Sequence, residues 1–431
     1  MNQGKYVFAQ LVEFLPKAKF DYIVKKYGGD KRIRTFSCWN QLLVMLFGQL
    51  SARESLRDTV ASIQAHASKC YHLGVGKSVF LPTIATANEK RDCRIFEEFA
   101  SLMIHQARML READPFDLPI KGNAYAFDSS TISLCLSLFP WAKFKYGKSA
   151  IKMHTQYDVR TNIPSLVVIT PASVNDVKGM DFIDVEAGSY YIFDRGYKDY
   201  RRLYDIHQQR GFFVFRAVDN LKFRRIYSLN IERNTSILAD QIGVFTTGNS
   251  PKRYPEKIRR IKYHDIEQDR VFLFLTNDFE SSAQTIADLY HKRWAIELFF
   301  KWIKQHLKVK SFWGTTENAV KIQIYAAIIA YCLVAIVAHE LKSEKSIYTI
   351  LQILSISLLD KTPVNQLLTN RDYRYNEEPD CNLLLFFCRC RRFHWLRFHS
   401  ICRRTLLSVF IEKTYHTVLS RSHIIGRSIP S

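Results

Sequence analysis

Residues 281–310, SSAQTIADLYHKRWAIELFFKWIKQHLKVK, carry apolar and polar side chains at the spacing of one long amphipathic helix. The apolar faces of this helix need a core to pack against, and they carry Ile286, Leu289, Ile296, Phe299, Phe300 and Ile303. The polar face is narrow and sets one carboxylate among cations; it carries Tyr290, Arg293, Glu297 and Lys304. The chain must therefore fold so that this helix rests on a core and holds Glu297 on a rigid support.

A glutamate in this position has two interpretations. One is an ordinary solvated Glu297 that contacts basic neighbours on its own helix. The other is a metal ligand whose neighbours Arg293 and Lys304 bind phosphate. The helix alone favours the ordinary interpretation, so other parts of the sequence have to decide.

The charge of the chain indicates its partner. Lys and Arg number 62 against 41 Asp and Glu, which gives a net charge of +21 and a pI of about 9.5. Such an excess is typical of proteins that bind a polyanion, nucleic acid first and an anionic membrane surface second. With 47% apolar residues and only 12 Pro and 16 Gly, the chain is globular and not disordered.

Two features bear on the compartment. The nine cysteines are scattered and odd in number, and no signal peptide is recognisable, so we expect a cytoplasmic protein without a disulfide framework. The apolar run 324–338, between Gln323 and His339, is shorter than the roughly 20 residues that span a bilayer. We therefore expect a buried core helix there and no membrane association, with a membrane protein as the remote alternative.

The N-terminal region, to about residue 115, has helical periodicity. The clearest helix is expected at 37–62, with Ser51 and Glu54 as a capping box inside that stretch, and a second basic helix at 83–94. Basic residues surround the first helix: Lys31, Arg32, Arg34, Arg53 and Arg57. Both a helix-turn-helix DNA reader and an ordinary helical bundle with a basic face fit this pattern.

From about residue 123 the period changes to that of strands. Segments rich in β-branched and aromatic residues predict strands at 124–133, 151–159, 165–171, 189–194, 212–218 and 271–278. Short helices are expected at 174–185 and 197–209, and longer ones at 320–341 and 346–359. The polar, basic stretch 219–269 has short candidate strands at 243–247 and 258–263, and it has the character of an insertion. The mixture predicts an α/β sheet covered by helices.

Two aspartates occupy informative positions in these strands. Asp128 follows the apolar run AYAF, and Asp194 ends SYYIF. An ionised Asp within a sheet is costly unless a metal, a cation or water receives it, although each alone also fits a cap or a turn. Together with Glu297 they suit phosphodiester chemistry, in which two Mg²⁺ ions about 4 Å apart stabilise the attacking and leaving oxygens.

Other candidate positions stay open. Lys145, Lys148, Lys152 and His154 fit the lining of a DNA channel as well as a solvated basic face, and His154 also fits a hydrogen-bonded strand histidine. The tail from residue 388 is strongly basic, and the spacing of Cys388, Cys390, His394 and His399 invites a zinc site but lacks the second half of one. An accessory basic tail is the favoured interpretation.

The motifs resemble a known family. Tyr290, Arg293, Glu297 and Lys304 match the Y-x2-R-x3-E-x6-K signature of DDE transposases of the insertion-sequence-four family. The segments FDSSTI (127–132) and FDRGY (193–197) are similar to the two aspartate motifs of that family. Segments 38–58 and 351–368 are similar to its N-terminal and C-terminal parts.

This resemblance implies a fold and a site. It implies an RNase H-like α/β core in which Asp128, Asp194 and Glu297 hold two Mg²⁺ ions, or Mn²⁺ in their place, while Tyr290, Arg293 and Lys304 bind DNA phosphates. The regions it implies are a helical DNA-binding region (1–115), the core (116–218 and 270–345), a β-rich insertion (219–269), a helical C-terminal region (346–387) and a basic tail (388–431).

The resemblance also implies an activity. Such enzymes bind terminal inverted repeats in double-stranded DNA, cleave at the element ends and join the 3′-OH to target DNA, as a homodimer or larger assembly. A nucleoid-associated location follows. Members can excise the element through a hairpin with a stacking Trp from the insertion, but no Trp lies between residues 142 and 293. Either Phe223, Tyr227 or Tyr254 takes that stacking role, or the excision step differs.

Two rival functions remain at this stage. One is an RNase H-like nuclease that cuts without joining, and the other is a catalytically silent DNA-binding protein derived from a transposase. Strand-transfer products separate the first from a transposase, and metal-dependent nicking separates the second.

Overall fold

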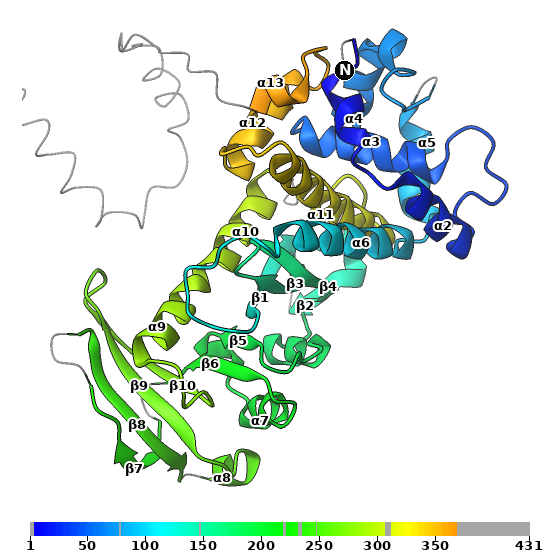
Figure 1. Cartoon of the computed structure of the whole chain (residues 1–431). Coiled ribbons are helices and arrows are strands. Elements are labelled where there is room, and N and C mark those ends of the chain that lie inside the picture. Colours follow the sequence, from blue (N-terminus) through cyan, green and yellow to red (C-terminus); the bar gives the residue numbers. More distant parts are fainter. Residues whose placement is uncertain are drawn as a thin grey trace, which may run out of the picture. The chain divides into compact units, whose positions relative to one another are not determined.

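The computed structural model describes residues 4–76, 79–145, 148–218, 221–231, 235–246, 248–306 and 312–368. The predicted basic tail, with its zinc candidates Cys388, Cys390, His394 and His399, lies outside the described residues. Figure 1 shows the described part as a long sheet with helices packed along it and a helical region at the N-terminal end.

One sheet joins the strands of the described residues. In spatial order they are β2 (Lys143–Lys145), β3 (Lys148–Asp158), β1 (Ala124–Leu134), β5 (Tyr190–Phe193), β6 (Phe212–Arg216), β10 (Arg270–Thr276), β9 (Ile258–Asp265), β8 (Ile237–Phe245) and β7 (Phe223–Ser228), and β4 (Ile163–Pro171) also pairs with β3. β1, β5 and β6 run parallel, whereas β6 and β10 are antiparallel. The strands predicted from period-2 patterns are confirmed, with ends shifted by a few residues.

The middle strands are apolar on both faces because helices cover both sides. Ala124, Ala126 and Ile192 belong to the core shared with the long helices, whereas Tyr125 and Phe127 belong to a second core with other aromatic residues. Alternation along a strand assigns successive side chains to opposite faces. A mixed α/β fold, with parallel central strands between helical layers, is therefore confirmed at this level.

The helix predicted at 281–310 is two helices. α9 (Ala283–Lys292) and α10 (Trp294–His306) meet at Arg293, which keeps right-handed helical angles. There the amide of Arg293 donates to the Tyr290 carbonyl and the amide of Ile296 donates to the Arg293 carbonyl, both three residues back. These tighter bonds interrupt the regular ladder without changing the direction of the chain greatly. Residues 307–310 lie outside the described residues.

The apolar run 324–338 lies within α11 (Glu317–Glu340), which packs against α3 (Cys38–Leu50), α5 (Leu81–Lys90), α6 (Arg94–Arg111) and α12 (Ile347–Ser357). By length and composition it is the one described helix that passes for a membrane span, yet 94% of its most apolar window is buried inside the fold. Packing on four helices accounts for its composition.

The N-terminal region is helical, as predicted, but its helices are shorter. The predicted helix 37–62 is divided into α3 and α4 (Leu56–Ala65), and the expected capping box at Ser51 and Glu54 is wrong. Ser37 and Asn40 form the capping box of α3, and Ser55 caps α4. The break falls at residues 51–55, where Ala52 takes a positive φ of 54° that no helix interior allows. α1 (Val7–Val12), α2 (Lys17–Tyr27) and α13 (Val364–Leu368) complete the region around α3 and α12.

The stretch predicted as an insertion contains more regular structure than the sequence suggested. β8 and β9 are each longer than the short strands expected at 243–247 and 258–263, and β7 and the short α8 (Ser250–Arg253) were not predicted. β9, β8 and β7 continue the sheet beyond β10 in antiparallel order. The buried pair Arg259 and Asp240 joins β9 to β8, with an Nη2 to Oδ2 distance of 2.7 Å.

Two predicted helices before β6 are corrected. The segment 174–185 forms a 3₁₀ helix, Asp176–Phe182. The helix predicted at 197–209 begins at Tyr200 as α7 (Tyr200–Gln208), because Asp199 caps it by accepting from the amides of Arg201 and Arg202. A short 3₁₀ turn, Arg195–Tyr197, fills the space between Asp194 and α7.

Candidate active site

Asp128 and Asp194 stand at the same level on two neighbouring strands. β1 and β5 are parallel, and the residues just before the two aspartates, Phe127 and Phe193, are register partners. Alternation assigns Asp128 to the face of Ala124 and Ala126, and Asp194 to the face of Tyr190 and Ile192. This is the face on which the long helices pack, so both carboxylates lie at the carboxyl ends of the central strands beneath α9 and α10.

Arg293 links the helix to the first strand. Its guanidinium donates through Nη2 to Oε1 of Glu297 at 2.5 Å, and Nη1 lies 3.5 Å from Oδ2 of Asp128. Because α10 packs over β1, the carboxylates of Glu297 and Asp128 lie on either side of the guanidinium. The Arg293 side chain is only 12% exposed, whereas Glu297 and Asp128 are 35% and 26% exposed. The sequence predicted one carboxylate, that of Glu297, among cations. The structure adds a second carboxylate to this group, that of Asp128 from the sheet.

Tyr290 connects α9 to the second aspartate. Its hydroxyl donates to Oδ1 of Asp194 at 3.0 Å, and its ring packs on Phe274 of β10 with centroids 4.6 Å apart. Arg216, at the end of β6, approaches the same carboxylate oxygen at 3.8 Å. Arg216 is a site residue that the sequence analysis missed, because its approach to Asp194 follows from the order of β5 and β6 in the sheet.

Lys304 lies one step further along α10. Its Nζ donates to the backbone carbonyl of Thr131 on β1 at 3.0 Å. Lys304 therefore stays over the strand that carries Asp128, three residues beyond it. The four residues of the helical signature all lie on the side of α9 and α10 that faces β1 and β5, although they come from two helices and not from one.

A network of hydrogen bonds from β1, β3 and the turn after Asp194 holds the carboxylate of Asp128. Oδ1 of Asp128 accepts from the amide of Ser129 at 2.8 Å and from the hydroxyl of Tyr197 at 3.3 Å. The Tyr197 hydroxyl is also 2.9 Å from Oγ of Ser129, and Ser129 Oγ is 2.7 Å from Nδ1 of His154. His154 Nε2 is 3.0 Å from the hydroxyl of Thr170. The sequence analysis missed Tyr197 and Ser129, although both lie inside the two aspartate motifs.

This network corrects two of the channel candidates. His154 is fully buried, and burial lowers its pKa to about 4, so it is the neutral, hydrogen-bonded strand histidine that the sequence left as one option. Lys152 is also buried; its Nζ donates to the Val174 carbonyl at 2.6 Å and pairs with Asp176 at 2.9 Å. Neither lines a channel. Lys148 is exposed, and the side chain of Lys145 lies outside the described residues.

Burial and neighbouring charges set the electrostatics of the site. Burial raises the pKa of Asp128, against the lowering effects of the Ser129 amide and Arg293. Burial lowers the pKa of Arg293, but Tyr290 and Glu297 outweigh it and the pKa rises. Burial also raises the pKa of Tyr290 to about 12, so its hydroxyl stays a donor at neutral pH. In this arrangement the guanidinium of Arg293 partly neutralises two acids.

The donor set suits a hard divalent cation. Three carboxylates are the ligands that Mg²⁺ and Mn²⁺ accept, and the burial of Asp128 calls for a nearby positive charge. As they stand, no three Asp, Glu, His or Cys side chains among the described residues form a group close enough to hold a metal ion. Arg293 lies between two of the three carboxylates and supplies the positive charge. The residues fit the ion in chemistry, although the three carboxylates are not gathered around one position.

Comparison with known proteins shows which family has this arrangement of residues. Residues 120–333 match the family described as a transposase DDE domain. A putative transposase of Sinorhizobium fredii is 36% identical over 260 residues, which cover 59% of this chain and 71% of that protein. The chain belongs to the DDE transposases. The matched range contains Asp128, Asp194 and Glu297, and it runs from just before β1 into α11.

Two further relatives of this transposase have similar coverage. The probable transposase for insertion sequence element IS5377 of Geobacillus stearothermophilus is 31% identical, over 59% of this chain and 66% of that protein. The putative transposase for insertion sequence element IS4SA of Synechocystis is 27% identical, over 60% of this chain and 72% of that protein. Residues 3–76, the first helices of the N-terminal region, match a domain of unknown function.

Proposed function

We propose that this transposase binds the terminal inverted repeats of its own element, cleaves the DNA there and joins the freed 3′-OH to target DNA. The proposal rests on one observation: Asp128 and Asp194 occupy equivalent positions at the ends of adjacent parallel strands. Arg293 contacts both Glu297 and Asp128 and so links the helix to the first of these strands. Strand ends of a parallel sheet are common sites for ligands, because side chains from several strands meet there. The membership in the DDE transposases supports the same role for these carboxylates.

Asp128, Asp194 and Glu297 are the proposed metal ligands. When bound, two Mg²⁺ ions, or Mn²⁺ in their place, would stabilise the negative charge on the attacking and leaving oxygens. The protein holds Asp128 in one orientation through the Ser129 amide and the Tyr197 hydroxyl. Tyr290 does the same for Asp194. Fixed carboxylates lower the cost of assembling the site around DNA.

The cations beside the carboxylates are the proposed phosphate contacts. Arg293 has a buried Nε without a hydrogen-bond partner among the described residues, so its present position leaves one donor unused. We propose that Arg293 turns from Asp128 to a phosphate oxygen of the DNA, since a phosphate accepts the same paired donors as a carboxylate. Lys304 lies on the same face and would contact the adjoining backbone. The Tyr290 hydroxyl, which is predicted to bind a phosphate, would have to leave Asp194 to do so.

The subfamily and the assembly are part of the proposal. The spacing of Tyr290, Arg293, Glu297 and Lys304 supports the insertion-sequence-four family, and one relative carries a related element name. A homodimer or larger complex that pairs two element ends, and a nucleoid-associated location, follow from that assignment. Of the three stacking candidates for a hairpin step, Tyr254 is buried and does not serve, whereas Tyr227 is 46% exposed.

A cleavage and joining assay tests the proposal. The substrate is a labelled duplex that carries the terminal repeat found in the DNA flanking the gene, and a pre-cleaved copy with a free 3′-OH. The proposal expects Mg²⁺-dependent nicking at the repeat and strand-transfer products from the pre-cleaved copy. Cutting without joining would identify the nuclease alternative. Tight repeat binding without any cutting in Mg²⁺ or Mn²⁺ would identify the catalytically silent DNA-binding protein.

A further inference from the structure

Lys152 and His154 are buried residues of β3 that the proposed function does not use. They are two positions apart, so their side chains project from the same face of the sheet. Ser129 on β1 is the register partner of His154, so Ser129 projects from that face as well. Because side chains alternate along β1, this is the face opposite to the one that carries the Asp128 side chain.

Hydrogen bonds define which nitrogen of His154 carries the proton. The hydroxyl of Thr170 donates to the carbonyl of Pro171 at 3.2 Å, so its oxygen is an acceptor for Nε2 of His154 at 3.0 Å. Burial lowers the pKa of His154 to about 4, so at neutral pH the ring has a single N–H. With that proton on Nε2, Nδ1 accepts from the hydroxyl of Ser129 at 2.7 Å.

Ser129 in turn holds the hydroxyl of Tyr197. Because Ser129 has one hydroxyl proton and donates it to His154, its oxygen is left as an acceptor for Tyr197. The Tyr197 hydroxyl lies 2.9 Å from that oxygen and 3.3 Å from Oδ1 of Asp128. The contact with Ser129 is the shorter one, so the position of the phenol beside the carboxylate depends on the part of the network that His154 holds.

The 3₁₀ helix Asp176–Phe182 packs on His154 and leaves no spare room there. A Cβ at Gly179 would lie 2.5 Å from Nδ1 of His154 and 3.1 Å from Cζ of Phe127. The ring of Phe182 also lies against the His154 ring, with centroids 5.9 Å apart. A side chain at position 179 would therefore displace the imidazole from Ser129.

Lys152 fastens this 3₁₀ helix to β3. Its Nζ donates to the Val174 carbonyl at 2.6 Å and pairs with Asp176 at 2.9 Å. The Lys152 side chain is 7% exposed, and a buried ammonium is costly unless bonds such as these compensate for the lost water. The same bonds hold the 3₁₀ helix against His154. The imidazole is therefore enclosed between Ser129 and Gly179.

We propose that His154 is a positioning residue for Asp128, and that Gly179 and Lys152 keep the imidazole in place. His154 acts on the carboxylate through Ser129 and Tyr197. The inference rests on the proposed function, since the orientation of Asp128 matters only if Asp128 binds a divalent ion. Partners that orient a metal ligand through hydrogen bonds typically change metal affinity by about 10- to 100-fold when they are lost.

Metal binding tests the proposal without relying on catalysis. The affinity for Mn²⁺ is measured by electron paramagnetic resonance on the full-length protein with terminal-repeat DNA bound. His154→Leu removes both ring nitrogens, so Mn²⁺ should bind about tenfold more weakly. His154→Gln offers an amide oxygen to Ser129 and an amide N–H to Thr170, so it should bind Mn²⁺ within about threefold of wild type.

Gly179→Ala is a second and independent perturbation. It keeps every hydrogen-bonding group but pushes the imidazole away from Ser129. The affinity for Mn²⁺ should fall by about threefold to tenfold. The Mg²⁺ concentration for half-maximal cleavage should rise by a similar factor, whereas the rate at saturating Mg²⁺ should stay within about twofold of wild type. A merely structural role of Gly179 would instead lower the rate at every Mg²⁺ concentration.

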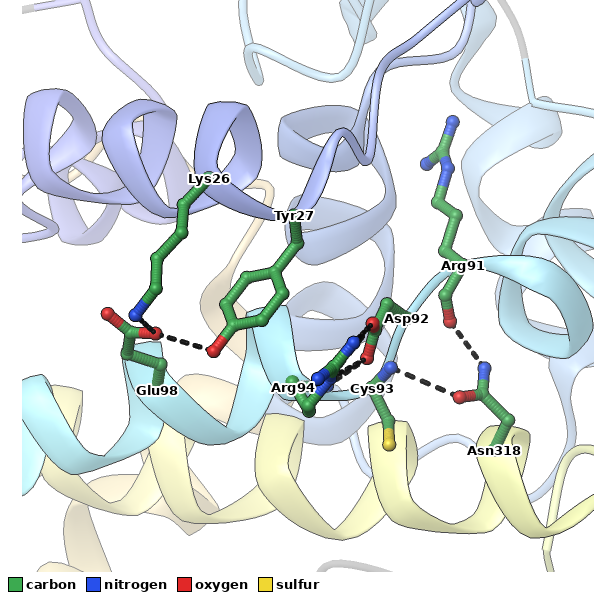
Figure 2. Close-up of polar contacts among 8 residues, drawn as sticks. All are labelled: Lys26, Tyr27, Arg91, Asp92, Cys93, Arg94, Glu98 and Asn318. Atoms are coloured by element: carbon green, nitrogen blue, oxygen red, sulfur yellow. Dashed lines mark hydrogen bonds and ion pairs between the residues drawn. The ribbon is translucent and has the colours of Figure 1, made fainter.

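Asn318→Ala is the matched control for lost stability. Figure 2 shows Asn318 of α11 at the turn after α5, where it donates to the carbonyl of Arg91 and accepts from the amide of Cys93. The variant loses hydrogen bonds, as His154→Leu does, but in the N-terminal region. Its melting temperature should fall, while its Mn²⁺ affinity should stay within about twofold of wild type because distant sites act independently.

The position of the His154 proton has its own measurement. In protein labelled with ¹⁵N-histidine, the ring signals that vanish in His154→Gln belong to His154. We expect Nε2 to be the protonated nitrogen in the wild-type protein. Thr170→Val removes the acceptor for that proton and should raise the fraction of rings protonated at Nδ1. A wild-type ring protonated mainly at Nδ1 would overturn the donor order on which the inference stands.

The metal measurements separate this inference from the proposed function. If Asp128→Asn binds Mn²⁺ as tightly as wild type, Asp128 is no ligand and the proposed function fails as well. If Asp128→Asn weakens Mn²⁺ binding but His154→Leu and Gly179→Ala bind the ion as tightly as the Asn318→Ala control, the inference alone is overturned.

Discussion

Asp128 and Asp194 follow register partners on two parallel strands, so their carboxylates leave the sheet side by side and toward the same helical layer. Nothing in either motif alone requires this, since each aspartate also suits a cap or a turn. The helical layer contributes Glu297 and the guanidinium that separates it from Asp128. The predictions below take each contact of this group in turn.

Removing any one carboxylate should stop catalysis while binding remains. We expect Asp128→Asn, Asp194→Asn and Glu297→Gln to lower the rate of repeat cleavage by ~10³-fold or more, about 4 kcal/mol of barrier, because each loses a charged metal ligand. Repeat affinity, measured by fluorescence anisotropy in EDTA, should change little. Asp205→Asn, on an exposed face of α7, is the control with the same change of charge. Cleavage by any of the three site variants near the rate of that control would contradict the assignment.

Tyr197→Phe tests the support of Asp128. The phenol hydroxyl contacts the carboxylate at 3.3 Å, and its loss should cost about 1–3 kcal/mol of orientation at a charged acceptor. We expect the Mg²⁺ concentration for half-maximal cleavage to rise several-fold, with a smaller loss of rate at saturating Mg²⁺. Tyr204→Phe removes a hydroxyl that contacts Glu256 at the surface and should leave the Mg²⁺ dependence unchanged. An unchanged Mg²⁺ dependence in Tyr197→Phe would mean that Tyr197 only fills space.

Arg293→Ala should act on DNA binding and on stability together. Without its guanidinium on a phosphate, the variant should bind the repeat more weakly and with a salt slope lower by about one. Without Mg²⁺ the variant leaves Asp128 and Glu297 without their shared cation, so its melting temperature should fall. Added Mg²⁺ should restore more stability to Arg293→Ala than to wild type. Arg202→Ala, which removes a half-buried cation paired with Asp181 and Asp199 away from the three carboxylates, is the control and should show no such Mg²⁺ effect on stability.

His154 predicts a pH dependence of stability. Burial lowers its pKa to about 4 from an ordinary 6.5, so the unfolded chain binds the proton more tightly than the folded one. The free energy of unfolding should therefore fall as pH drops from about 6.5 to about 4, by up to roughly 3 kcal/mol from this residue. His154→Gln should show a shallower decline over the same window in chemical denaturation at each pH. A variant curve parallel to wild type would show that other groups cause the decline.

The sequence predicted the pieces of this site better than their surroundings. Apolar runs rich in β-branched and aromatic residues located β1 and β5, because strands buried on both faces have an unbroken apolar signature. The helical spacing of Tyr290 to Lys304 survives the break at Arg293. The break arises where the amides of Arg293 and Ile296 donate to the carbonyls three residues back, and composition does not encode such bonds. Arg216 and Tyr197 were missed because their roles arise from strand order and from the turn after Asp194.

The N-terminal region shows the same limit. Its basic residues were visible in the sequence, but the sequence did not show that residues 32–36 and α5 line one cleft, beside which Arg91 donates to the carbonyls of Phe36 and Ser37. β7 was missed because it is exposed along nearly its whole length, and β8 was underestimated because it exposes Leu238 and buries Asp240, so neither strand shows the alternation that identifies a half-buried strand.

The central claim is that Asp128, Asp194 and Glu297 bind the same divalent ions, and site-directed cleavage of the protein by bound iron tests it most directly. Fe²⁺ takes the place of Mg²⁺ in carboxylate sites, and with ascorbate and peroxide it cuts the polypeptide beside its ligands. With terminal-repeat DNA bound, we predict fragments from cuts near residues 128, 194 and 297 that all disappear together with excess Mg²⁺. Cuts at other positions, or at one of the three without the others, would contradict a shared metal site.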